Sequence, residues 1–159
     1  MLPGSRVEGL APAVVLELFH VFDALRQHIS IVIVEHNLDL VLALADRCSF
    51  EVAEFLEYDA RGERFDVVLG MGYFDYVEDA VPHLRKMAEL CKGRVFASFP
   101  KRWEWRVPVR RLRFALHGGY VRFYSRGQVE ALPKACGLAE ERAAIIDLGR
   151  DYLLVLRTS

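Results

Sequence analysis

The sequence predicts an α/β fold, a three-layer arrangement around a mostly parallel sheet that ends in an antiparallel hairpin. Short runs of β-branched and apolar residues, typical of strands buried on both faces, alternate along the chain with segments of helical periodicity. The last two runs are separated only by Gly149-Arg150-Asp151, which is too short for a crossover and therefore predicts an antiparallel pair. At 159 residues the chain suits one domain, residues 1–159.

The first third of the chain is expected to hold two helices and two strands. Residues 12–27 have apolar side chains at helical spacing, and Pro12 suits a first helical turn. Residues 29–34 are almost all β-branched and apolar, as in a buried parallel strand. Helical spacing returns over residues 38–47, and residues 50–56 alternate as a further strand. Because nothing before Pro12 has the pattern of a strand, we expect the sheet to be incomplete at its N-terminal end.

The middle of the chain contains the clearest strand and helix signals. Residues 65–69 predict a buried strand, and residues 79–91 predict an amphipathic helix. A strand over residues 95–99 should follow. Ser125 predicts the N-cap of a helix over residues 126–136.

Three further features complete the expected layout. Pro133 removes one hydrogen bond from its helix, so we expect a kink or a shifted start there. Residues 101–119 are rich in Trp and Arg and predict an inserted helix near residues 109–116. The closing hairpin should pair strands near residues 143–148 and 152–156.

Composition indicates a globular protein of a reducing compartment. The chain is 53% hydrophobic and 27% charged, and its net charge of −1 gives no general attraction to nucleic acid or to acidic membranes. Its three cysteines lack paired spacing, which predicts free thiols and no metal site. No stretch approaches the roughly 18 apolar residues of a membrane span, and the first ten residues lack the apolar run of a signal peptide. We therefore expect a cytoplasmic protein.

One resemblance covers about residues 8–48. It is carried by Glu8-Gly9-Leu10-Ala11-Pro12, by the run Ser-Ile-Val-Ile-Val-Glu-His-Asn that ends at Asn37, and by Leu44-Ala45-Asp46-Arg47. These stretches resemble the D-loop to H-loop region of ABC-transporter ATPases, especially those of branched-chain amino-acid importers. The resemblance implies that His36 is the switch histidine that senses the γ-phosphate. The chain has no G-x-x-x-x-G-K-[ST] motif to cradle phosphates, so an ATP-binding remnant is the alternative to the function described next.

A second resemblance covers about residues 50–159, two thirds of the chain. The residues that carry it are Phe65-Asp66-Val67-Val68-Leu69-Gly70-Met71-Gly72, Phe74-Asp75-Tyr76-Val77, Leu84-Arg85-Lys86-Met87, Gly93-Arg94-Val95-Phe96-Ala97-Ser98-Phe99-Pro100, Val129-Glu130-Ala131-Leu132 and Gly137-Leu138. They resemble the C-terminal part of class I methyltransferases. The resemblance implies a Rossmann-like sheet, S-adenosylmethionine as cofactor and a small-molecule methyl acceptor. The family's glycine-rich cofactor loop is missing, so we expect methyl transfer to be impaired.

The two segments, residues 8–48 and 49–159, meet at a seam near Cys48. The chain therefore has the pattern of a chimeric, truncated product: a natural fusion, a rearranged gene product or a designed recombinant. The methyltransferase resemblance implies that residues 31–34 supply the family's second strand. Glu35 would then accept hydrogen bonds from the ribose hydroxyls of the cofactor. The alternative left open is a solvated acid at a strand end.

The resemblance implies further cofactor contacts. Glu54 would accept from the adenine amino group, and Phe55 would flank the adenine ring. Gly70, Met71 and Gly72 follow the clearest strand, at the end of a parallel strand where ligands bind and where glycine permits close backbone approach. The alternatives are a surface carboxylate at Glu54 and a simple turn at the glycines.

Substrate contacts are expected after the same strand and in a basic, aromatic stretch. Asp75 and Tyr76 match the family's variable position facing the substrate; the alternatives are a helix cap and a half-buried aromatic ring. Residues 101–126 hold eight of the chain's 21 Lys and Arg residues, among them Arg110 and Arg113, interleaved with aromatic rings. This stretch suits a lid over an anionic or aromatic small substrate, or else a solvated helix. Nucleic acid is not expected, since no RNA-binding signature is found.

The sequence assigns no catalytic residue, because methyl transfer depends largely on aligning donor and nucleophile. His83 is predicted to be structural, and His117 is the candidate for a base. A non-catalytic module that binds a partner through its basic, aromatic stretch remains an alternative function. An incomplete sheet would expose strand edges, which favours a homodimer.

Overall fold

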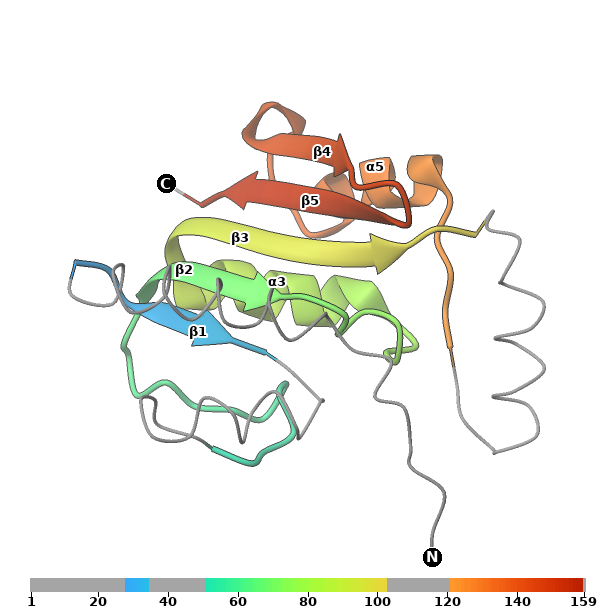
Figure 1. Cartoon of the computed structure of the whole chain (residues 1–159). Helices are drawn as coiled ribbons and strands as arrows, with labels where there is room; N and C mark the ends of the chain where they lie inside the picture. Colours follow the sequence, from blue (N-terminus) through green and yellow to red (C-terminus); the bar gives the residue numbers. More distant parts are fainter. Residues whose placement is uncertain (1–27, 35–50, 103–120, 159) are drawn as a thin grey trace, which may run out of the picture.

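A computed structural model describes residues 28–34, 51–102 and 121–158. The described elements are, in chain order, β1 (Ile31–Ile33), β2 (Phe65–Gly70), α3 (Ala80–Leu90), β3 (Cys91–Pro100), α5 (Arg126–Ala135), the short 3-10 helix η2 (Glu140–Arg142), β4 (Ala143–Asp147) and β5 (Asp151–Arg157). From β2 onward, strands and helices alternate up to the closing hairpin (Figure 1). The predicted helices over residues 12–27, 38–47 and 109–116 lie outside the described residues.

The described strands form one mixed sheet in the order β1-β2-β3-β5-β4. Strands β1, β2 and β3 are parallel, whereas β5 is antiparallel to both β3 and β4. The hairpin of β4 and β5 pairs Ala143 with Leu156 and Asp147 with Tyr152. The prediction of a mostly parallel α/β sheet with an antiparallel C-terminal hairpin is confirmed.

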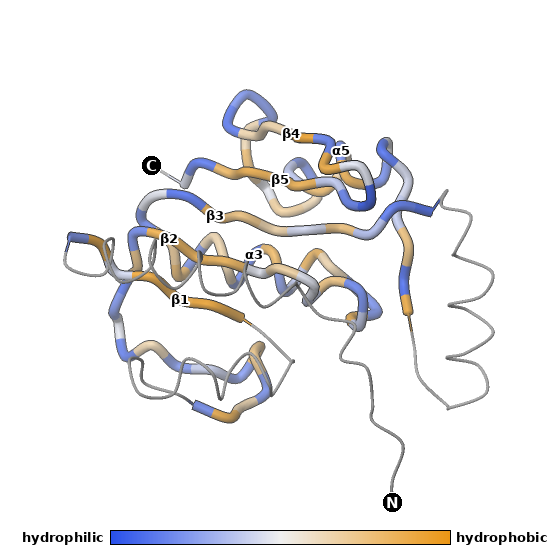
Figure 2. Tube along the Cα trace, in the orientation of Figure 1, coloured by the Kyte–Doolittle hydropathy of each residue, from blue (hydrophilic) through white to orange (hydrophobic). Residues whose placement is uncertain are grey.

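Helices α3 and α5 contact each other and cover one face of the sheet, α3 over β2 and β3, and α5 over β4 and β5 (Figure 1). Between them lies a core of fully buried side chains, which includes Val68, Leu84, Met87, Val95, Val129, Leu154 and Leu156. Hydrophobic residues follow the strands, and hydrophilic ones gather in the connecting turns (Figure 2). Among the described residues, this is the one helical layer of the three-layer arrangement.

Both helices begin with a side-chain cap, and the cap at Ser125 confirms the prediction. The Asp79 side chain accepts a hydrogen bond from the Val81 N–H (3.0 Å) at the start of α3. At α5, Ser125 and Gln128 form a reciprocal capping box. Pro133 lies within α5 without shifting its start, so that part of the expectation is wrong. The ring falls in the last turns, and the following Leu138 N–H closes back on the Pro133 carbonyl (2.9 Å).

Residues 51–56 form no strand, which corrects the strand predicted over residues 50–56. They turn instead, with the Glu57 N–H bonded to the Glu54 carbonyl at 2.9 Å. Phe55 is buried, whereas Val52 and Leu56 are exposed. A half-buried strand needs several buried apolar side chains on one face, and residues 51–56 have only one buried side chain, that of Phe55. Glu54 therefore lies in a turn and not at a strand end, and its contact with adenine stays a prediction.

The place of β1 also differs from the expectation. Ile31 pairs with Val67 and Ile33 with Leu69, and the Val34 N–H donates to the Leu69 carbonyl (2.7 Å). In doubly wound sheets of order 3-2-1-4-5-6, the neighbour of the fourth strand is the first strand. With β2 as the fourth strand, β1 therefore occupies the place of the first strand, and its assignment as the second strand is wrong.

One carboxylate fastens β1 to β2 at their amino ends. Asp66 Oδ2 accepts from the Ser30 N–H (2.8 Å) and the Ser30 hydroxyl (2.7 Å), and the Asp66 N–H donates back to Ser30 Oγ (3.1 Å). Lys92 Nζ lies 3.3 Å from Asp66 Oδ1. The Ser30 hydrogen bonds, aided by Lys92, lower the pKa of Asp66 to about 2.

We expect this link to make the fold acid-sensitive. Because the pKa of Asp66 is lower in the folded chain than in the unfolded one, its contribution is complete above the unfolded value of 3.8 and is lost as the pH falls toward 2. Urea denaturation between pH 5 and about 2 should show a smaller loss of stability for Asp66→Asn than for the wild type. Glu63→Gln, an exposed acid near the same strand, should keep the wild-type slope. Equal slopes for the wild type and Asp66→Asn would contradict the role of Asp66.

Candidate functional site

The carboxyl ends of β1, β2 and β3 meet at one edge of the sheet, because the three strands are parallel. Ligands of open α/β sheets bind outside such an edge. The segment that leaves β2 there, residues 71–79, is here called the edge loop. It leads into α3. Besides Gly72, it contains Met71, Asp75 and Tyr76, which are also expected to contact cofactor or substrate.

The edge loop is held from β3 and from the segment before α5. The Gly72 N–H donates to Ser98 Oγ (2.7 Å), and the ring of Phe74 stacks on that of Phe99 (4.6 Å between centroids, 29°). The Tyr124 hydroxyl donates to the Phe74 carbonyl (3.3 Å). The loop therefore has a fixed backbone, as a binding site needs.

Two residues that anchor the edge loop, Ser98 and Arg122, were not found from the sequence. Ser98 is buried on β3, and its hydroxyl fixes Gly72. Arg122 uses its backbone N–H to bond the Asp75 carbonyl at 2.8 Å. Ser98 carried a signal, since it is the one polar side chain in the apolar run Phe96-Ala97-Ser98-Phe99. Arg122 carried none, because a backbone contact between distant segments leaves no side-chain pattern.

Gly70 and Gly72 have different surroundings. A Cβ on Gly70 would lie 2.6 Å from Met87 Cε and 3.2 Å from the Phe74 ring, so a larger residue there would have to displace the flexible end of Met87. Gly72 has φ +69°, and no atom of the described residues lies within 4 Å of the position that its Cβ would take. The backbone at Gly72 is thus open to an approaching molecule. The cofactor contact expected of Gly70 stays a prediction.

Beside Gly72, exposed apolar side chains adjoin a buried acid. Met71 and Tyr76 are each 38% exposed, although both are large and apolar. Asp75 is only 7% exposed. The cap of α3 is Asp79, so the alternative of Asp75 as that helix's cap is wrong. An open backbone, two exposed apolar side chains and a buried carboxylate together form a surface that can bind a partly apolar small molecule.

A second cluster lies where the edge loop meets α3. The Tyr73 hydroxyl and His83 Nδ1 are 2.7 Å apart, and the Phe55 ring stacks on His83 (6.2 Å, 15°). Burial, with a further contribution from the Glu54 charge, raises the pKa of Tyr73 to about 12, and burial lowers the pKa of His83. These contacts agree with the structural role expected of His83. The contact of Phe55 with adenine stays a prediction, and its ring already packs against Tyr73 and His83.

Four expected residues cannot be placed. Glu35, His36, Arg110 and Arg113 lie outside the described residues, as does the candidate base His117. Within the described part of the chain, no three His, Cys, Asp or Glu side chains gather to hold a metal ion. None of the described helices is long and apolar enough to cross a membrane.

Comparison with known proteins finds matches to the fold of this chain but none to its sequence. No protein-family model matches the sequence, and no curated protein matches it significantly. Solved structures do match. An O-methyltransferase family protein from Burkholderia thailandensis is 19% identical over 92% of this chain, with a TM-score of 0.57. The chain shares the Rossmann-like fold of this protein.

Two further methyltransferases of known structure are similar in fold to this chain. The magnesium protoporphyrin IX methyltransferase of Synechocystis, solved with bound S-adenosylhomocysteine, is 13% identical over 92% of this chain and 83% of its own, with a TM-score of 0.57. A SAM-dependent methyltransferase from Thermotoga maritima is 13% identical over 86% of this chain and 76% of its own, also with a TM-score of 0.57. The chain spans 57% of the length of the Burkholderia protein. At these identities the likeness establishes the Rossmann-like fold alone.

Proposed function

We propose that this chain binds S-adenosylmethionine at the carboxyl edge of its sheet and transfers the methyl group to a small molecule. The observation that carries the proposal is the edge loop: Gly72 leaves its backbone open, and Met71 and Tyr76 are exposed beside the buried Asp75. The methyltransferase fold of the structural neighbours, one of them solved with S-adenosylhomocysteine, supports it. When bound, the cofactor supplies an electrophilic methyl group.

The chain's own residues would bind and orient the cofactor and the methyl acceptor. The open backbone at Gly72 admits the cofactor, and Asp75 and Tyr76 face the methyl acceptor. Glu35 directly follows Val34, which is bonded to the carboxyl end of β2, so this acid comes from the strand next to the edge loop. Because β1 occupies the place of the first strand, the second-strand argument for a ribose contact no longer applies, and Glu35 is proposed as an acid that accepts a hydrogen bond from the cofactor. Holding the two reactants in line is the main catalytic requirement of such a transfer.

We propose that cofactor binding is weak. With β1 in the place of the first strand, the segment that follows it is Glu35-His36-Asn37-Leu38, which contains no glycine. The backbone there cannot approach a ligand as closely as a glycine-rich loop does. This is the physical basis for the impaired transfer expected from the sequence.

We also propose that residues 8–48 and 49–159 act as a single domain in spite of their different resemblances. The support is the ladder between β1, from the first segment, and β2, from the second. The cytoplasm is the proposed location, in keeping with the free, buried thiols of Cys91 and Cys136. The homodimer stays a prediction; among the described strands, β1 and β4 are the two sheet edges available for pairing.

Calorimetric titration of the full chain with S-adenosylhomocysteine tests the proposal. We expect a Kd of about 0.1–1 mM, the range of a partly formed site. Glu35→Ala should weaken binding by about 1–3 kcal/mol, the value of a hydrogen bond to a charged group. Glu63→Ala, at the opposite end of β2, is the matched control and should bind like the wild type.

One outcome would overturn the proposal, and a second would remove one residue from it. Absence of heat at millimolar S-adenosylhomocysteine would reject cofactor binding by this chain. Unchanged affinity in Glu35→Ala would reject the contact of Glu35 with the cofactor while leaving the edge loop in place. ATP is expected to give no heat; ATP binding that His36→Ala abolishes would favour the ABC-ATPase remnant instead.

A further inference from the structure

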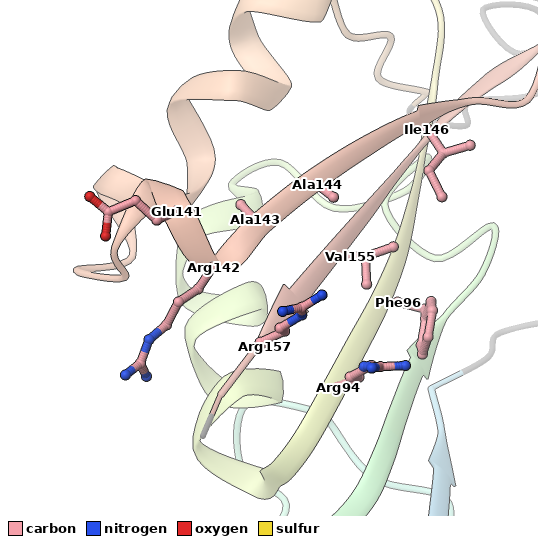
Figure 3. Close-up of a pocket in the computed structure, with 9 residues that line it drawn as sticks. All are labelled: Arg94, Phe96, Glu141, Arg142, Ala143, Ala144, Ile146, Val155 and Arg157. Atoms are coloured by element: carbon pink, nitrogen blue, oxygen red, sulfur yellow. The ribbon is translucent and has the colours of Figure 1, made fainter.

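A groove opens on the sheet face opposite α3 and α5, where β3, β5 and β4 lie side by side (Figure 3). It has a volume of about 330 Å³ and is lined chiefly by Arg94, Phe96, Ala144, Ile146, Val155 and Arg157. We call it the arginine groove. Its size is at the lower end of the range for small-molecule sites, roughly 300–1,000 Å³.

The groove contains two like charges in direct register. Arg94 on β3 pairs with Arg157 on β5 across the antiparallel ladder. Both side chains are exposed and lie on the same side of the strands (Figure 3). Like charges directly opposite each other destabilise a sheet. No carboxylate in the described ranges forms an ion pair with either arginine, and Glu141 at the rim points away from both. The described chain thus concentrates positive charge here and leaves it unneutralised.

The floor beside the two arginines is apolar. Phe96 pairs with Val155 across the same ladder, next to the arginine pair, and Ile146 on β4 is 48% exposed. Ala144 is opposite Val155 on the other side, and its short side chain leaves room between the larger ones. An exposed apolar strip that ends at two guanidinium groups is complementary to a molecule with a negatively charged head and an apolar body.

The arginine groove is distinct from the candidate functional site. In the ladder of β3 and β5, the arginine pair is near the amino end of β3, whereas the carboxyl edge lies at the pair of Pro100 and Asp151. The groove therefore neither depends on the edge loop nor rests on the proposed methyl transfer.

We propose that the arginine groove binds a small carboxylate with an apolar body. Each guanidinium group donates to one carboxylate oxygen, and the apolar body lies along Phe96, Val155 and Ile146. The bound carboxylate also neutralises the repulsion between Arg94 and Arg157, so binding stabilises the sheet. Guanidinium groups suit this task because they remain charged and match carboxylate geometry.

Titration of the ¹⁵N-labelled full chain with sodium octanoate, followed by NMR, tests this directly. We expect saturable shifts of the amides of Arg94, Phe96, Val155 and Arg157. Octanol, which has the same tail without the charge, should bind at least about tenfold more weakly. Arg157→Gln, on β5, should weaken octanoate binding by a similar factor. Arg94→Gln, on β3, should have the same effect. Arg61→Gln, in the turn before β2, is the matched control and should bind like the wild type.

Thermal melting separates binding from a purely structural role. Because each glutamine variant removes a like-charge pair, we expect its Tm without ligand to rise by about 1–3 °C. Octanoate should raise the Tm of the wild type and of Arg61→Gln but not that of Arg157→Gln. Absence of shifts at 10 mM octanoate (about −3 kcal/mol of binding or weaker), equal binding of octanol, or unchanged binding in both glutamine variants would overturn the proposal.

Discussion

Replacing Gly93 with alanine is expected to lower the free energy of unfolding by about 3 kcal/mol. A Cβ at this position would lie 2.3 Å from the Asp66 carbonyl oxygen, closer than any real contact allows. The obstacle is backbone of the neighbouring strand, beside a register irregularity between β2 and β3, so relief requires the strands to part. The Gly93 carbonyl also accepts from the N–H and hydroxyl of Thr158 (3.0 and 3.2 Å). One methyl group therefore disturbs β2, β3 and the end of β5 together.

Chemical denaturation followed by circular dichroism measures this effect. Gly127→Ala is the matched control, because Gly127 lies in α5 and no described residue outside its own helix lies within 4 Å of its Cβ position. The control should gain about 0.5–1 kcal/mol, the usual difference between alanine and glycine in a helix. Similar stabilities for the two variants would mean that the contact between Gly93 and Asp66 is not tight in solution.

The second large effect is expected from Phe74→Ala. The Phe74 ring is fully buried, stacks on Phe99 and meets Tyr73 edge to face (5.4 Å, 82°). Removing it should destabilise the chain by about 3–5 kcal/mol, through lost burial and the cavity that remains. Since folded domains are stable by only about 5–15 kcal/mol in total, the variant should be near its unfolding threshold at 37 °C.

Phe74→Leu keeps most of the volume and should cost less than about 1.5 kcal/mol. Comparing the urea midpoints of the two variants isolates the cavity. If Phe74 also fixes the edge loop, Phe74→Leu should bind S-adenosylhomocysteine more weakly than the wild type while remaining folded. A leucine variant as unstable as the alanine variant would show that aromatic contacts, rather than volume, hold the loop.

The strands and helices from Phe65 onward followed from local patterns. The run of apolar residues in β2, the periodicity of α3 and the Ser125 cap of α5 are signals of short range, and the structure contains each of them. The short connection at Gly149 fixed the antiparallel hairpin for the same reason. Local chemistry was sufficient wherever propensity, periodicity and turn residues agreed.

The failures came from contacts between distant segments. Residues 51–56 alternate weakly, but Phe55 is held by Tyr73 and His83, and this packing overrides the pattern. The neighbour of β1 could not be read from β1 itself, because an apolar strand pairs equally well in several places. For the site, sequence located the edge loop but not the anchors Ser98 and Arg122, whose roles exist only once β3 and residues 121–124 lie beside it.

The position of β1 links binding to local unfolding. It is a three-residue edge strand among the described elements, tied to the sheet by its ladder with β2 and by Ser30. Short edge strands are the elements that detach first in the native state. The acid proposed to hold the cofactor is two residues beyond that strand. A ligand that binds Glu35 would therefore also raise the protection of β1, and occupancy of the site and closure of the sheet would rise together.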